Sequence, residues 1–234
     1  MAEKGGPMRA LRAKGAETVA EIPGSTDRQS AVRLLACIDA AGSPDRSDQW
    51  GPDVVVALHA QSRLQALDFW MRNPDYLANE LLTEFEAGGD QTLVHLAQRI
   101  FDDREPDLRR LPMIRYHFGA FEPLDNALSI LRAADLIRIR RQGIPGQVRE
   151  HIYVLTAKDR AAMVSLAGAA PEFEWYQARA AIVARIAGDQ GGKALKDRQY
   201  LQHEYAGTEL NHIIASITDR VRERLSAILR SLPK

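Results

Sequence analysis

The sequence has little of the chemistry that marks several protein classes. It contains a single cysteine, Cys37, so it lacks the disulfide framework of many small secreted domains. Cys37 lies among Leu34, Leu35 and Ile38, which predicts a buried and unreactive thiol. No apolar run approaches the roughly 20 residues of a membrane span, and the N-terminus lacks the apolar core of a secretion signal. We therefore expect a cytoplasmic protein that does not contact a membrane.

The chain also lacks net charge, since 31 lysine and arginine residues face 31 aspartate and glutamate residues. A dedicated nucleic-acid-binding protein is usually basic, so any contact with DNA must come from a local basic patch. The 234 residues, of which 45% are hydrophobic, are enough for a full core in one large domain or two small ones.

Motifs of catalysis and metal binding are missing as well. His203-Glu204 lacks the second histidine of a zinc-protease helix, and no cysteine or histidine spacing fits a structural metal site. There is no glycine-rich phosphate loop and no Gly-x-Ser-x-Gly elbow. We therefore expect no enzyme activity, no catalytic residue, no bound metal and no cofactor.

The most informative stretch present is residues 121–163. It reads as a helix over 122–135, a strand over 136–140, a turn over 143–146 and a return strand over 152–155. Thr156 and Asp159 then have the spacing of a helix cap, with aspartate in place of the usual glutamate. This is the layout of the second half of a winged helix, a module used for DNA binding and for subunit docking.

Four arginines flank the predicted turn, with no acidic residue between the first and the last. They are Arg138, Arg140, Arg141 and Arg149. Strand alternation places Arg138 and Arg140 on the face opposite Ile137 and Ile139. Because each guanidinium can donate two hydrogen bonds to an anionic oxygen, the hairpin is a candidate for contact with DNA phosphates. Pairing with acidic groups of a partner protein, or simple solvation, are the alternatives.

The helix before the hairpin is poorly suited to reading bases. Glu122, Asp125 and Asp135 oppose a lone Arg132, and carboxylates near phosphates weaken binding. Asn126 and Ser129 could touch bases, but base-specific recognition is not expected. Contact with the DNA backbone, blind to sequence, remains the expectation.

Two family resemblances follow from these residues. Leu128, Leu131, the Ala-Asp-Leu-Ile stretch 134–137 and the Tyr-Val-Leu-Thr-Ala-Lys-Asp-Arg stretch 153–160 resemble the second half of MarR- and PadR-type winged helices. The chain departs from that pattern at Asp135 and Asp159, where those families carry glycine. This resemblance covers about a sixth of the chain and implies a winged-helix fold. One function it implies is that of a homodimeric transcriptional regulator.

Residues 64–78, Leu-Gln-Ala-Leu-Asp-Phe-Trp-Met-Arg-Asn-Pro-Asp-Tyr-Leu-Ala, resemble the small middle component of bacterial three-component ABC-ATPase defence systems of the Lamassu group. That resemblance implies a non-catalytic winged-helix subunit between an SMC-like (Rad50-like) ATPase and an effector protein, in anti-phage or anti-plasmid defence. It also implies contact with double-stranded DNA held by the ATPase. The same residues fit a helix end and a restart at Asn73-Pro74-Asp75 in any helical domain.

The remaining sequence predicts helices on both sides of the winged unit. We expect a disordered tail over 1–27, a helical region over 28–101, the winged-helix core over 102–168 and C-terminal helices over 169–234. Residues 53–86 are expected to be helical in two segments, and 113–118 could be a strand or a helical turn. Residues 193–205 are expected to form one helix.

A last long helix is expected to begin at Thr208, with an apolar stripe that needs a partner surface, either in its own fold or on another subunit. The candidate partner-binding residues are Trp70, Tyr76, Ile217, Val221 and Leu225. The predicted fold is therefore mainly α, a winged helix-turn-helix with a small β-hairpin wing and flanking helices. An accessory subunit and a homodimeric regulator both stay open as functions.

Overall fold

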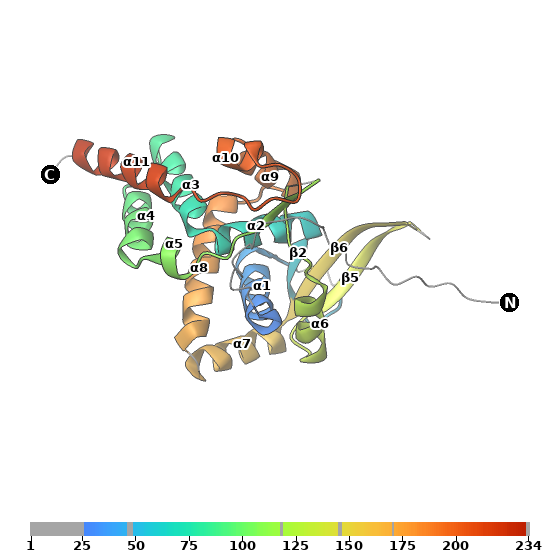
Figure 1. Ribbon diagram of the computed structural model, residues 1–234. Coiled ribbons are helices and arrows are strands. Elements are labelled where there is room, and N and C mark those ends of the chain that lie inside the picture. The colour runs from blue at the N-terminus through green and yellow to red at the C-terminus, as the bar shows by residue number, and fades with distance from the viewer. Residues whose placement is uncertain (1–25, 46–48, 118, 145–146, 170, 233–234) are drawn as a thin grey trace.

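The structure, a computed structural model, describes residues 26–45, 49–117, 119–144, 147–169 and 171–232. It is mainly helical with a small antiparallel sheet, as predicted at that level (Figure 1). Residues 1–25 of the predicted tail and residues 145–146 of the predicted turn lie outside the described residues. Within the described ranges, no helix combines the length and the apolar composition needed to cross a membrane.

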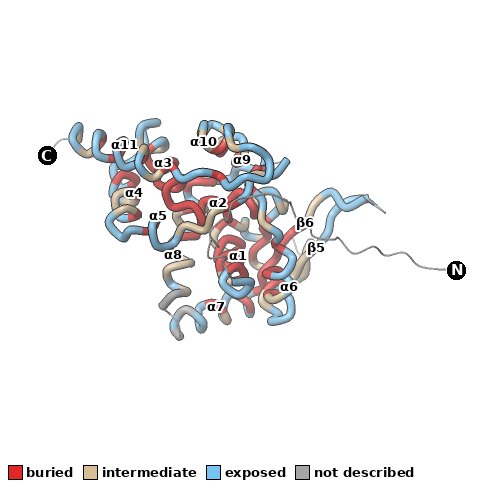
Figure 2. Tube along the Cα trace, in the orientation of Figure 1, coloured by how far each residue is buried: buried red, intermediate tan, exposed pale blue. Residues whose placement is uncertain are grey.

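Helices surround a large hydrophobic core that takes side chains from every predicted region after residue 27 (Figure 2). A second, small cluster of Val54, Ala57, Ile152 and Val154 lies on the sheet. The longer helices are α1 (Asp27–Ala41), α2 (Gln61–Arg72), α3 (Pro74–Glu86), α4 (Thr92–Asp102), α6 (Asp125–Ala133), α7 (Ala157–Ala169), α8 (Pro171–Ala187), α9 (Gly192–Tyr200) and α11 (Thr218–Ser231). Two short helices, α5 (Glu105–Leu108) and α10 (His203–Gly207), connect them. The predicted single helix over 193–205 is therefore wrong, because the chain turns between α9 and α10.

Four strands form the larger sheet, in the order β1 (Ser43–Pro44), β2 (Val54–His59), β6 (Gln147–Thr156) and β5 (Arg138–Ile144). Neighbouring strands are antiparallel. The end of β6 near its helix is buried and its first residues are exposed, so β5 and β6 project from the body as an extended hairpin (Figure 1). We call this hairpin the wing.

The expectation of helix over the start of 53–86 is wrong. Val54–His59 forms β2, which pairs with residues 152–156 of β6 in the middle of the sheet. Three successive valines favour an extended backbone, since β-branched side chains pack well on a pleated surface. A short apolar run of this kind does not reveal by periodicity alone whether it is helix or strand.

The restart at residues 73–75 is confirmed, with Pro74 as the first residue of α3. The expected cap differs in detail. The Asn73 side chain does not cap α3; its Nδ2 donates a 2.9 Å hydrogen bond to the carbonyl oxygen of Phe69 on the preceding helix. Asn73 therefore closes α2 rather than opening α3.

The predicted order of helix, strand, strand and helix over 122–168 is confirmed in α6, β5, β6 and α7. The predicted cap is also confirmed. The Thr156 N–H donates to Asp159 Oδ2 at 2.7 Å, and the Asp159 N–H donates to Thr156 Oγ1 at 3.2 Å. This reciprocal pair satisfies two backbone donors at the point where β6 becomes α7.

Asp135 ends α6 in the left-handed conformation, with φ at 53°. Its N–H donates to the Arg132 carbonyl at 3.1 Å, and the Leu136 N–H donates to the Leu131 carbonyl at 2.9 Å. These two bonds define a Schellman motif, which usually carries glycine at the left-handed position. The aspartate thus departs from the winged-helix pattern in sequence but adopts the backbone that glycine would.

The short second sheet corrects the C-terminal prediction. Residues 114–116 form β3, which pairs with β4 (Gly119–Phe121), so the ambiguous stretch is a strand. Ile213 forms an isolated antiparallel bridge with Ile114. The predicted helix start at Thr208 is therefore wrong: residues 211–214 run alongside β3, Asn211 has a φ of 66°, and α11 begins only at Thr218.

The expectation that five apolar side chains face a partner also requires correction. Trp70, Tyr76, Ile217, Val221 and Leu225 are all buried, and each belongs to the larger hydrophobic core. The stripe on α11 packs against α3 and α4 of the same chain. Because these side chains satisfy one another inside the monomer, they offer no surface to a second protein in this conformation.

Candidate nucleic-acid interface

The candidate interface consists of α6 and the wing. Ala127, Leu128 and Leu131 are the buried face of α6, which packs against α1. The opposite face of the helix is exposed and lies beside β5. The core thereby fixes α6 next to the wing, with its polar face in solvent.

The register of the wing places its arginines on different sides. Arg138 and Arg140 pair with Val154 and Ile152, whereas Arg141 pairs with His151. Paired residues share a face, so Arg138 and Arg140 share one face and Arg141 lies on the other. The predicted alternation of Arg138 and Arg140 against Ile139 agrees with this register.

Arg149 lies at an irregularity of the wing. The register shifts between Gln142 and Gly143, which pair with Glu150 and Val148, so Arg149 is the extra residue of a bulge. Gly143 is required here because a Cβ at that position would collide with the Gln147 carbonyl oxygen. The bulge leaves Arg149 exposed near the tip of the hairpin.

Three of the four predicted arginines are available to a ligand. Arg138 is engaged, since its Nη1 lies 2.9 Å from Asp53 Oδ2. The side chains of Arg140, Arg141 and Arg149 make no hydrogen bond or ion pair with another residue of the described ranges. We call these three the wing arginines.

Two of the three carboxylates around α6 are engaged in ion pairs, which the sequence did not predict. Glu122 lies before the helix and its Oε2 is 3.0 Å from Nη1 of Arg72. Asp135 lies 3.6 Å from the Lys158 ammonium. Of the three carboxylates, only Asp125 lacks an ion pair with another described residue. The face of α6 toward the wing is therefore less repulsive to an anion than its composition implies.

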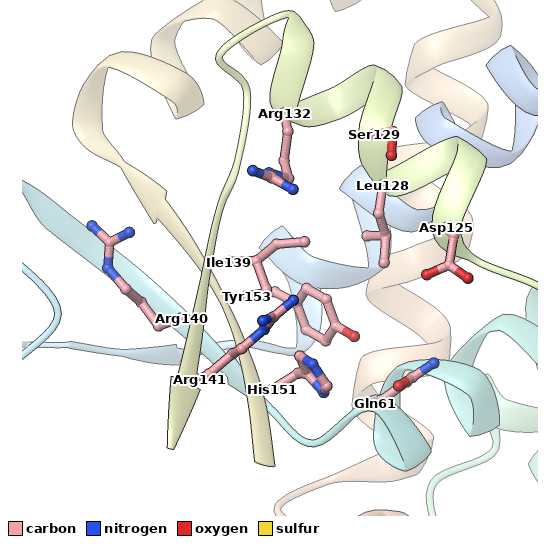
Figure 3. Close-up of a pocket in the computed structure, with 10 residues that line it drawn as sticks. All are labelled: Gln61, Asp125, Leu128, Ser129, Arg132, Ile139, Arg140, Arg141, His151 and Tyr153. Carbon is pink, nitrogen blue, oxygen red and sulfur yellow. The ribbon is translucent and has the colours of Figure 1, made fainter. Parts of the chain in front are cut away.

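A cavity of about 540 Å³ lies between α6 and the wing. Its lining comes from α2, α6, β5 and β6, and comprises Gln61, Asp125, Leu128, Ser129, Arg132, Ile139, Arg140, Arg141, His151 and Tyr153. Figure 3 shows Arg132 reaching down from α6 and Arg141 and His151 lying near Tyr153, while Arg140 extends away from α6. We call this space the α6–wing cavity.

The polar side chains that converge on this cavity are not used by the fold. Within the described ranges, Gln61, Asp125, Ser129, Arg132 and Arg141 make no side-chain hydrogen bond or ion pair, nor do the side chains of His151 and Tyr153. Burial, reinforced by the charge of Asp125, raises the pKa of Tyr153 to about 12. Its hydroxyl is therefore protonated at neutral pH and able to donate a hydrogen bond into the cavity.

A second feature of the surface is apolar. Ile114, Tyr116, Phe121 and Ile213 are 47%, 44%, 39% and 39% exposed. The strand pairing puts them on one face of the small sheet, and the rings of Tyr116 and Phe121 have centroids 5.4 Å apart. We call this group the exposed apolar face.

Sequence reasoning found the wing arginines but missed the cavity. Gln61 lies far from the wing in sequence. It reaches the cavity because β2, which pairs with β6, ends at His59 and is followed directly by α2. Arg141 and His151 are cross-strand neighbours only in one register of the hairpin. The sequence does not fix that register, because it does not fix the length of the turn. The alternation of side chains along a strand did predict that Arg140 and Arg141 lie on opposite faces of the hairpin.

Comparison of the chain with protein-family models, with curated proteins and with solved structures finds no match. Among the described residues, no group of three or more histidine, cysteine, aspartate or glutamate side chains is placed to hold a metal ion.

Proposed function

We propose that this chain is a winged-helix accessory protein that contacts the phosphate backbone of double-stranded DNA without reading its sequence. The observation that carries the proposal is the set of wing arginines, three exposed or half-exposed guanidinium groups with no ion pair among the described residues. Unpaired arginines on a projecting hairpin suit phosphate oxygens, which accept paired hydrogen bonds from each guanidinium.

The topology supports the winged-helix assignment. Helix α6 directly precedes β5, and the return strand β6 pairs both with β5 and with β2 from the first part of the chain. Helices α3 to α5 and the small sheet lie between α2 and α6 and lengthen the module. The Schellman end of α6 and the cap at Thr156 are further points in common with the MarR- and PadR-type pattern.

Sequence-blind contact is favoured over base reading. Of the side-chain types that usually read base edges, the exposed face of α6 offers Asn126 and Arg132, and Asn126 already donates a 3.2 Å hydrogen bond to Asp27. With zero net charge over the chain, binding would depend on the wing and weaken steeply with salt.

The accessory role places the protein in a complex with an SMC-like ATPase and an effector, in cytoplasmic defence against phage or plasmids. Its support is the resemblance of residues 64–78, most of which lie inside the core. A protein partner must therefore contact other residues. The exposed apolar face offers such residues, because contiguous exposed apolar side chains often mark interaction sites.

Binding to two DNA duplexes of equal length and unrelated sequence tests the proposal. We expect the two affinities to agree within a few-fold, and the triple variant Arg140→Ala, Arg141→Ala, Arg149→Ala to lose at least ~10-fold, about 1.4 kcal/mol. As a matched control we choose Arg99, Arg185 and Arg230, which are exposed on α4, α8 and α11 and have no ion pair within the described ranges. We call these the distal arginines, and their triple alanine variant should bind like the wild type.

A homodimeric MarR- or PadR-like regulator is the second candidate. Two features favoured it, the MarR-like ending of residues 153–160 and a C-terminal helix suited to dimerisation, and the apolar stripe of that helix is used within the monomer. A specificity ratio of about 10³ or more for one operator, together with a stable dimer, would favour the regulator over the accessory protein.

A further inference from the structure

We propose that the α6–wing cavity binds one nucleoside 5′-monophosphate, either free or at the end of a DNA strand. The ligand could be the end of a DNA strand or a free mononucleotide, since both present the same chemical groups. The inference rests on the proposed DNA contact only in the first case. The cavity volume of about 540 Å³ falls within the range of small-molecule sites.

The charge of the lining fits a phosphomonoester. Three arginines line the cavity against one aspartate, and no lining arginine has an ion pair within the described part of the chain. Arg132 and Arg141 approach from opposite walls, one from α6 and one from β5 (Figure 3). A terminal phosphate carries between one and two negative charges at neutral pH and has enough oxygens to accept from both guanidinium groups.

The floor of the cavity fits the nucleoside part. Ile139, which is half-buried, provides an apolar surface against which a base can pack, while Leu128 and the ring of Tyr153 are buried. Asp125 and Gln61 lie on the other side of the cavity from Arg132 in Figure 3. A carboxylate there would repel a phosphate but can accept hydrogen bonds from the amino group of a base. The two ends of the cavity thus suit the two ends of a nucleotide.

The polar side chains of the lining are free for a ligand. Seven of them make no side-chain hydrogen bond or ion pair within the described ranges, and four of these, Asp125, Ser129, Arg132 and Arg141, are exposed. The protonated Tyr153 hydroxyl and the Ser129 hydroxyl add donors. A lining this polar suits a charged, hydrogen-bonding ligand better than an apolar one.

Titration of the full-length protein with deoxyadenosine 5′-monophosphate, followed by calorimetry or ligand-observed NMR, tests this site. We expect it to bind at least ~10-fold more tightly than deoxyadenosine or inorganic phosphate, since only the nucleotide uses both ends of the cavity. Arg132→Ala should lower the affinity by about 10-fold or more, while the matched control Arg99→Ala should leave it within twofold.

A second variant keeps every charge and fills the space. Ser129 is exposed on α6, so Ser129→Trp should fold normally and block the cavity. We expect it to abolish nucleotide binding. Unchanged nucleotide binding in Ser129→Trp and Arg132→Ala would overturn the proposal, as would a nucleotide that binds no better than phosphate alone.

Two DNA-binding measurements distinguish a DNA end from a free mononucleotide as the ligand. A duplex with 5′-phosphorylated ends that binds more tightly than its 5′-hydroxyl counterpart identifies a DNA end as the ligand, and equal binding of the two identifies a free mononucleotide. Each result is a difference between two duplexes that have the same backbone, so it does not depend on whether the wing arginines contact that backbone. If the wing arginines prove irrelevant to closed duplexes while the mononucleotide still binds, the proposed function fails and the cavity assignment stands.

Discussion

The Asp75 carboxylate at the start of α3 accepts a 2.8 Å hydrogen bond from the backbone N–H of Ile217, directly before α11. The same oxygen, Oδ2, accepts from the Ser216 hydroxyl at 2.7 Å. Ile217, the N-cap residue of α11, makes no side-chain cap hydrogen bond. Asp75, more than a hundred positions earlier in the chain, instead holds the backbone N–H of that residue and so fixes the start of the helix. Next to it, the Tyr76 hydroxyl donates to the Ala215 carbonyl at 2.9 Å. The stretch that suggested a partner-binding motif therefore anchors the C-terminal helix of its own chain.

Replacing Asp75 should loosen α11. We expect Asp75→Ala to lower the free energy of unfolding by about 2–3 kcal/mol, because the Ile217 N–H and the Ser216 hydroxyl lose their shared acceptor. Hydrogen exchange should show faster exchange over Thr218–Ser231. Asp219→Ala, an exposed acid in the first turn of the same helix, should cost less than about 1 kcal/mol. Equal losses in the two variants would show that Asp75 does not hold α11.

Asp135→Gly should stabilise the protein. Asp135 holds a φ of 53°, which glycine adopts without the penalty of a Cβ atom. We expect a gain of about 0.5–1 kcal/mol in urea denaturation, reduced slightly by loss of the exposed pair with Lys158. Asp135→Ala keeps the Cβ and loses the local hydrogen-bonding ability of aspartate, so it should not stabilise. A loss of stability on Asp135→Gly would show that the charge matters more than the backbone.

Replacing one partner of the Glu105–Arg179 ion pair should destabilise the protein more than replacing both partners by apolar residues. Both side chains are buried and in direct contact. Burial raises the pKa of Glu105 and lowers the pKa of Arg179, so the fold disfavours each charge. Arg179→Met should cost about 3–5 kcal/mol because it strands a carboxyl group, while adding Glu105→Leu should recover most of that loss. Urea denaturation of the single and double variants measures this, and a double variant less stable than the single one would refute it.

Cys37 should react with thiol reagents only when the protein unfolds. The side chain is 1% exposed, and burial raises the pKa of its thiol above the ordinary value. Both the access and the thiolate that alkylation requires are therefore missing in the folded protein. We expect the labelling rate to follow the unfolding rate as urea is increased. Rapid labelling in the absence of denaturant would show that α1 opens locally.

The parts of the fold that the sequence predicts are those with local causes. The proline at position 74, the Thr156–Asp159 cap and the alternation of the wing depend on residues close together in the chain. The strand β2 was missed because Val54–His59 becomes a strand through its pairing with β6, almost a hundred residues later. The start of α11 was missed because the residues directly before it are held by Asp75, which is distant in the sequence. In each case a tertiary contact decided between two locally acceptable conformations.

The candidate site divides in the same way. The wing arginines were predictable from a turn flanked by arginines, but their availability was not, since it depends on Asp53 engaging Arg138 and leaving the others unpaired. The predicted partner residues were wrong because an amphipathic stripe shows that a helix needs an apolar neighbour and does not show which one. The cavity required the hairpin register and the placement of Gln61 by α2.

The salt dependence of DNA binding tests the central claim most directly. Each phosphate contact of the wing contributes roughly 0.9 to the slope of log affinity against log salt concentration. Replacing the wing arginines by alanine should therefore make that slope shallower by roughly 2 to 3, while replacing the distal arginines should leave it unchanged. If both triple variants keep the wild-type slope, or if both lose it equally, the wing does not hold the DNA backbone and the proposed function is wrong.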